Sequence, residues 1–124
     1  MLSIENVKSA YGRIEVLHGV TLHIEAGEIV TLIGANGAGK TTLMHAISGV
    51  QSITEGIIRY EGKEIGRRPA HARVALGISQ VPEGRQIFEP LSVKDNLMLG
   101  AWLHRGGDAT KELARVFALF PMLE

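Results

Sequence analysis

A glycine-rich segment followed by a lysine and two threonines has the clearest chemistry in this sequence. The pattern G-x-x-x-x-G-K-[ST] is matched at every defined position by Gly34, Ala35, Asn36, Gly37, Ala38, Gly39, Lys40 and Thr41. Glycines allow successive backbone N–H groups to converge on phosphate oxygens. Lys40 can place a charge on the β- and γ-phosphates, the Thr41 hydroxyl can ligate Mg²⁺, and Thr42 is placed for a further phosphate contact. The sequence therefore predicts a P-loop (Gly34–Thr42) for a nucleoside triphosphate.

The elements on both sides of the P-loop fit this prediction. Residues 28–33 are apolar on both faces and rich in β-branched side chains, which is typical of a central strand buried on two sides. Residues 40–48 are expected to form a helix that ends at Gly49. The loop would then lead onto a helix N-terminus, whose unpaired N–H groups and dipole favour anions. A chance glycine-rich turn is the alternative, and this context disfavours it.

Periodicity and turn residues predict the remaining elements. Ser92, with Asp95 three positions later, resembles a capping box that starts a helix at residue 93. Pro69 suits the first position of another helix. We expect further strands at 2–7, 20–24, 56–60 and 78–81, helices at 70–76 and 111–120, and a break at 105–108.

Composition excludes several classes of function. The 124 residues suffice for one domain with a modest core, and 13 basic residues balance 13 acidic ones. A net charge of zero gives no field for a nucleic-acid partner, and the cluster Arg67, Arg68 and Arg73 is expected to be a solvated helix face. Without cysteine there is no disulfide or thiolate metal site, and the five histidines lack ligand spacing. No apolar run approaches the roughly 20 residues of a membrane span.

Several ordered motifs carry a resemblance to a known family. Besides the P-loop they are Tyr11-Gly12, Val16, the segment 81–88 (Val-Pro-Glu-Gly-Arg-Gln-Ile-Phe), Leu91-Ser92-Val93 and Asn96-Leu97. Together they cover essentially the whole chain, which resembles the ATP-binding subunits of ABC transporters. The segment 81–88 is similar to the branched-chain amino-acid transporter branch of that family.

The resemblance implies a fold and a nucleotide site. The fold would be the α/β P-loop NTPase of the ABC ATPase type, with an N-terminal antiparallel β part and the start of a helical subdomain. The ligands would be ATP and Mg²⁺, with Lys40 as the catalytic residue and Thr41 as the metal ligand. Tyr11 would stack on the adenine with Val16 beside the ring, although a core or surface tyrosine is the alternative. Glu83 falls where the family usually has a γ-phosphate-sensing glutamine, unless it is a solvated loop acid.

The resemblance also implies partners and a location. Transmembrane permease subunits and a second ATP-binding subunit, in a homo- or heterodimer, would hold the protein at the cytoplasmic inner face of the membrane. No nucleic acid is expected. Phe88, Pro90 and Leu91 lie where the family forms the groove for the permease, or they form a local apolar cluster beneath a loop.

The segments needed for hydrolysis in the family have no counterpart after Phe120: no acidic Walker B strand, no signature and no switch histidine. Residues 1–124 are therefore expected to be the truncated N-terminal part of a single nucleotide-binding domain. The parent would hydrolyse ATP to import amino acids, whereas the isolated chain would be a nucleotide-binding module without hydrolysis. An ABC-type ATPase unconnected with transport and a small P-loop kinase are disfavoured alternatives.

Overall fold

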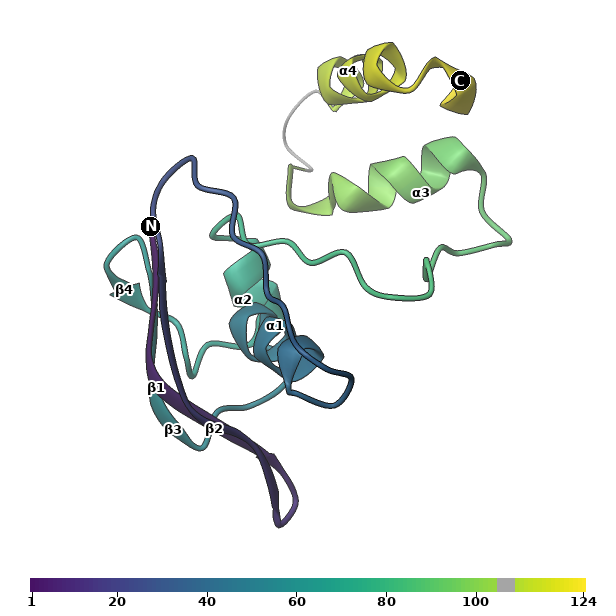
Figure 1. Ribbon diagram of the computed structural model, residues 1–124. Helices are drawn as coiled ribbons and strands as arrows, with labels where there is room; N and C mark the ends of the chain where they lie inside the picture. The colour runs from purple at the N-terminus through teal and green to yellow at the C-terminus, as the bar shows by residue number, and fades with distance from the viewer. Residues whose placement is uncertain (105–108) are drawn as a thin grey trace. The chain divides into compact units, whose positions relative to one another are not determined.

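The structure is a computed structural model that describes residues 1–104 and 109–124 (Figure 1). These residues form two compact units, 1–80 and 81–124, and each is described by itself. The break expected at 105–108 lies outside the described residues. In the described part of the chain, no helix is both long enough and apolar enough to cross a membrane.

The first unit is built on an antiparallel sheet. Two tight hairpins connect its strands, and left-handed residues make both turns: Gly12 (φ 61°) in one, Glu61 (φ 49°) and Gly62 (φ 74°) in the other. Such turns match the right-handed twist of paired strands. The described strands, in the spatial order β2-β1-β3-β4, are β2 (Ile14–Ile24), β1 (Leu2–Tyr11), β3 (Glu55–Tyr60) and β4 (Lys63–Glu64).

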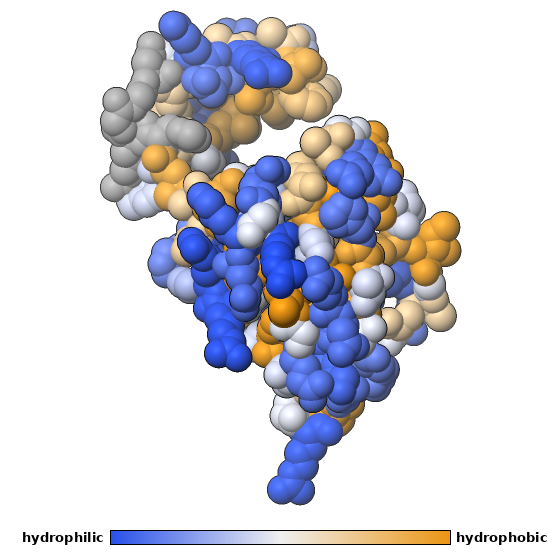
Figure 2. Space-filling view, turned by 90° about the vertical axis from the view of Figure 1, so that its left-hand side faces the viewer, coloured by the Kyte–Doolittle hydropathy of each residue, from blue (hydrophilic) through white to orange (hydrophobic). Residues whose placement is uncertain are grey.

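One face of this sheet carries the core. Helices α1 (Lys40–Ser48) and α2 (Ala70–Val74) lie on the same side of the sheet (Figure 1). Each fully buried Leu, Ile or Val contributes about 1.5–3 kcal/mol. The buried apolar residues are Leu2, Ile4, Val7, Leu17, Leu43, Ala46, Ile58 and Ile65. The face of the sheet turned away from α1 is mainly hydrophilic (Figure 2), as the period-two alternation of its strands requires.

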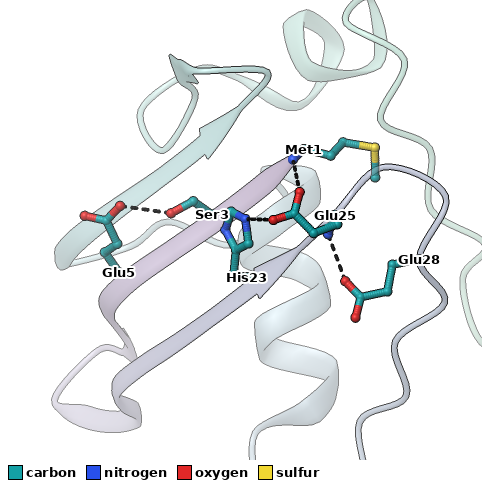
Figure 3. A network of polar contacts seen from close by, with 6 residues as sticks. All are labelled: Met1, Ser3, Glu5, His23, Glu25 and Glu28. Atoms are coloured by element: carbon teal, nitrogen blue, oxygen red, sulfur yellow. Dashed lines mark hydrogen bonds and ion pairs between the residues drawn. The ribbon is translucent and has the colours of Figure 1, made fainter.

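A small polar network closes the end of the sheet from which the chain leaves for the P-loop (Figure 3). Glu25 Oε1 lies 2.8 Å from His23 Nε2, and Glu25 Oε2 lies 3.9 Å from the Met1 ammonium. The Glu25 backbone N–H donates to Glu28 Oε2 at 2.8 Å. Because these groups are exposed, their ion pairs add little stability. Their effect is geometric, since the Glu28 carboxylate fixes the turn after β2.

The prediction of a buried central strand at 28–33 is wrong for this structure. The segment belongs to no strand, and Ile29 and Ile33 are 94% and 93% exposed. A strand needs a hydrogen-bonded neighbour, and a central parallel strand needs covered faces as well. Within residues 1–104 and 109–124, every strand belongs to the antiparallel sheet and none pairs with 28–33. The strand expected at 78–81 is absent for the same reason.

The described residues of the second unit, 81–104 and 109–124, form two helices and two short 3₁₀ segments. Ser92 caps α3 (Val93–Gly100), as predicted: its Oγ accepts from the Asp95 N–H at 3.1 Å and donates to the Asp95 carboxylate at 2.6 Å. Asn96 secures the preceding loop, since its side chain accepts from the Phe88 N–H at 3.0 Å and donates to the Phe88 carbonyl at 3.1 Å. The remaining elements are η1 (Trp102–His104), α4 (Thr110–Leu119) and η2 (Pro121–Leu123).

A candidate phosphate-binding loop

The P-loop connects the extended segment 28–33 to α1, whose first turn contains Lys40, Thr41 and Thr42. Gly39 is the N-cap residue, with a left-handed backbone (φ 90°, ψ 6°), and its carbonyl accepts from the Leu43 N–H at 2.9 Å. The described residues place no side-chain cap on this helix end. Because the N–H groups of a first helical turn have no partner within the helix, they can bind an anion.

Gly39 is required at its position for two reasons. Its positive φ disfavours any residue with a Cβ. A Cβ there would also lie 3.0 Å from Leu17 Cδ2, 3.2 Å from the Val16 carbonyl oxygen and 3.5 Å from Val16 Cγ1. Gly37 has a similar φ of 83°, but a Cβ on it would meet nothing within 4 Å. The P-loop is therefore seated on β2 at Gly39 and open at Gly37.

Lys40 folds back over the loop that precedes it. Its Nζ donates to the carbonyl oxygens of Gly34 and Ala35, each at 2.7 Å. An ammonium carries three N–H donors, so one remains for a phosphate oxygen. These two bonds place the positive charge over the glycine-rich loop, where β- and γ-phosphates would sit if the helix N-terminus held a nucleotide.

The two threonines differ in exposure. Thr41 is exposed, so its hydroxyl is accessible to a metal ion that also binds phosphate oxygens. Thr42 is only 7% exposed and lies next to the core residue Leu43. The predicted metal role of Thr41 is compatible with this exposure, and the predicted phosphate contact of Thr42 stays a prediction.

The structure shows a contact with the P-loop for one of the predicted residues outside the loop. Val16 contributes to the surface on which Gly39 rests, as the contacts above show. Tyr11 ends β1 and is 49% exposed, so one part of its ring is available for stacking. Glu83 lies in an exposed stretch of the second unit, and its relation to the phosphates stays a prediction.

The sequence patterns do not predict the role of one residue that supports the P-loop helix. Arg73, expected on a solvated face, is 2% exposed and hydrogen-bonds to carbonyls of α1. Its position contains a signal that could have revealed this. Ala70, Arg73 and Leu76 recur at a spacing of three, and both neighbours are partly buried, so this spacing places Arg73 on the inward side of α2.

Comparison with known proteins identifies one family across most of the chain. Residues 17–124 match the family described as "ABC transporter". One relative is the high-affinity branched-chain amino acid transport ATP-binding protein BraG of Pseudomonas aeruginosa, to which the chain is 43% identical. The alignment covers all 124 residues of the chain and 53% of the length of BraG. Another relative is the lipopolysaccharide export system ATP-binding protein LptB of Escherichia coli K12, to which the chain is 41% identical over 97 residues. This alignment covers 78% of the chain and 40% of the length of LptB.

A solved structure agrees with these relatives. An ATP-binding cassette of an ABC transporter, in its ADP conformation, superposes with a TM-score of 0.74 and 27% identity, over 93% of this chain and 45% of that one. The predicted P-loop NTPase fold of the ABC ATPase type is thus confirmed, although its strand at 28–33 is not formed here. The chain spans about half the length of the curated relatives it matches.

Proposed function

The chain belongs to the ABC transporter family, and from this premise we propose that its P-loop binds the phosphates of Mg-ATP. The observation that supports this most directly is the geometry at the start of α1. A left-handed Gly39 leaves the first-turn N–H groups open, and the Lys40 ammonium lies beside them over the loop. Unpaired N–H groups, a helix dipole and a mobile cation at one point form a site for a polyphosphate.

Each residue has a distinct task in this proposal. Lys40 would exchange its bonds to the loop carbonyls for the β- and γ-phosphates and stabilise the charge that develops there. The Thr41 hydroxyl fits Mg²⁺, a cation that takes oxygen ligands and keeps several waters. When bound, the ion would neutralise charge on the phosphates. Tyr11 would stack on the adenine with Val16 beside it.

The relatives support a proposal for the physiological setting. We propose that the whole protein is the ATP-binding subunit of an importer for branched-chain amino acids, as the name of BraG describes for that protein. LptB is named for lipopolysaccharide export, so the substrate assignment rests on the higher identity to BraG and on the segment 81–88. The partners would be permease subunits and a second ATP-binding subunit at the inner face of the membrane.

For residues 1–124 alone we favour binding without hydrolysis. Phosphoryl transfer to water requires an acidic residue for the metal and a group that orients the attacking water. The recorded bonds of Lys40 Nζ go to backbone carbonyls, so no described acid is held beside it.

Calorimetric titration with Mg-ATP, together with a phosphate-release assay, tests this proposal. Lys40→Ala should weaken binding at least tenfold, because a charged hydrogen bond to phosphate contributes about 1.5–3 kcal/mol. Lys63→Ala is the matched control, since Lys63 is an exposed lysine of the same unit, placed on β4. Equal binding by both variants would refute the role of Lys40. Phosphate release that disappears in Lys40→Ala would refute the preference for binding alone.

A further inference from the structure

A buried arginine lies at the end of α1 opposite the P-loop. Arg73 is 2% exposed, although arginine is rarely buried unless its donors are satisfied. In the described part of the chain, no carboxylate is recorded within ion-pair distance of it. Its guanidinium donates instead to the backbone carbonyls of Arg68 (2.8 Å), Ile47 (2.9 Å), Gly66 (2.9 Å) and Ala46 (2.5 Å).

Two of these carbonyls belong to the last turn of α1, where helix carbonyls lack partners within the helix. The N–H groups of Gly49 and Gln51 both donate to the His45 carbonyl, at 2.9 and 3.1 Å. The carbonyls of Ala46 and Ile47 are therefore left for the guanidinium. A cation at this point also interacts favourably with the negative end of the helix dipole. The side chain of Arg73, from helix α2, thus caps the C-terminal carbonyls of α1.

The contact leaves no room for a larger residue at Gly49. A Cβ there would lie 2.8 Å from Arg73 Nε and 3.1 Å from Ala70 Cα, and its φ of 87° is itself unfavourable for other residues. Burial lowers the pKa of Arg73 from its ordinary value, but arginine keeps its proton in proteins, so the charge persists. The end of α1 and the start of α2 are therefore in direct contact.

We infer that Arg73 is a positioning residue for the phosphate site. Helix α1 has nine residues and is roughly 13 Å long, with Lys40 and Thr41 at one end and Arg73 bonded to the other. The first end rests on β2 through Gly39, and the guanidinium holds the second end against α2 and Gly66. Fixing both ends fixes the axial position of α1, and with it the first-turn N–H groups. This inference rests on the proposed function of the P-loop.

Two substitutions and one control separate positioning from stability. Arg73→Met keeps an unbranched side chain and removes all of its hydrogen-bond donors. Arg73→Lys keeps the positive charge but loses the planar guanidinium group, which can donate to several carbonyls at once. Ile58→Val destabilises the same core from β3, since Ile58 is fully buried. For each variant we would measure Mg-ATP affinity, corrected for the folded fraction, and the hydrogen exchange of the Leu43 amide, which donates to the Gly39 carbonyl at the start of α1, relative to β1.

The expected result is about tenfold weaker binding by folded Arg73→Met, a smaller loss in Arg73→Lys and none in Ile58→Val. Exchange of the Leu43 amide, which donates to the Gly39 carbonyl, should accelerate relative to β1 only in the Arg73 variants. Wild-type affinity and exchange in the folded Arg73 variants would overturn the inference and leave a purely stabilising role. If Arg73→Met does not fold, Arg73→Lys decides. If the wild-type chain binds no Mg-ATP, the proposed function fails, and the exchange of the Leu43 amide alone decides the role of Arg73.

Discussion

Substitution of the two left-handed glycines in the P-loop by alanine would measure how tightly the loop is seated on the sheet. Gly37 and Gly39 have φ angles of 83° and 90°, so alanine meets a similar backbone penalty at both. The surroundings differ: a Cβ on Gly37 meets open space, whereas one on Gly39 lies 3.0 Å from Leu17 Cδ2 and 3.2 Å from the Val16 carbonyl. The pair therefore separates backbone strain from steric contact.

The two costs follow from these distances. A left-handed backbone costs a non-glycine residue about 1–2 kcal/mol, which is the expected loss for Gly37→Ala. Overpacking adds typically 1–3 kcal/mol, so Gly39→Ala should lose about 2–5 kcal/mol. Of the two contacts at Gly39, the Leu17 methyl is the end of a side chain and can rotate away, whereas the Val16 carbonyl is backbone of β2 and can move only with the strand.

Urea denaturation followed by far-UV circular dichroism measures both losses, and Mg-ATP titration of the folded variants gives the functional effect. We expect Gly39→Ala to be the less stable variant by at least about 1 kcal/mol and to bind Mg-ATP more weakly. Equal losses of stability in the two variants would contradict the reasoning, because they would mean that the loop moves off β2 without cost.

Two further predictions concern other parts of the chain. Ser92→Ala should destabilise α3 by about 1 kcal/mol, because it removes the acceptor for the Asp95 N–H in the first turn. An increase in amide exchange over the wild type that occurs in α3 and not in α4 would verify this. The hydrogen bond from the Ser3 hydroxyl (2.9 Å), followed by the contact with Arg59 (2.6 Å), lowers the pKa of Glu5. The Glu5 carboxylate therefore stabilises the folded state above the pKa that it has in the unfolded chain, and this stabilisation is lost as the pH falls through the lower pKa of the folded state. Urea midpoints of Glu5→Gln should therefore fall less than those of wild type below about pH 4.3.

Features governed by local rules could be predicted from the sequence. The helix after the P-loop was expected at 40–48 with its end at Gly49, and α1 has these bounds because Gly39 and Gly49 both take the left-handed conformation of a helix boundary. The Ser92 cap was predicted for a similar reason, since cap and first turn are adjacent in sequence. The backbone conformation of the P-loop depends on residues of the same short stretch.

Features that depend on distant partners could not be predicted. The apolar run at 28–33 has the composition of a buried strand, but strand formation depends on neighbours that composition does not reveal. The burial of Arg73 is not predicted from its charge, because helix periodicity is the better guide here: the position faces inward together with Ala70. Backbone carbonyls of α1, Gly66 and Arg68 accept from the guanidinium and make this burial tolerable. The metal role of Thr41 and the stacking role of Tyr11 stay predictions.

The exposed segment before the P-loop has a consequence for the behaviour of this chain in solution. Five successive residues, from Ile29 to Ile33, are apolar or β-branched, and they contain neither proline nor charge. A segment of this composition with open backbone hydrogen-bonding groups is a template for intermolecular β-pairing. Self-association through this segment would compete with nucleotide binding, because the same residues lead directly into the P-loop. The colloidal stability of the chain and the integrity of its proposed phosphate site therefore depend on the same residues, 29–33.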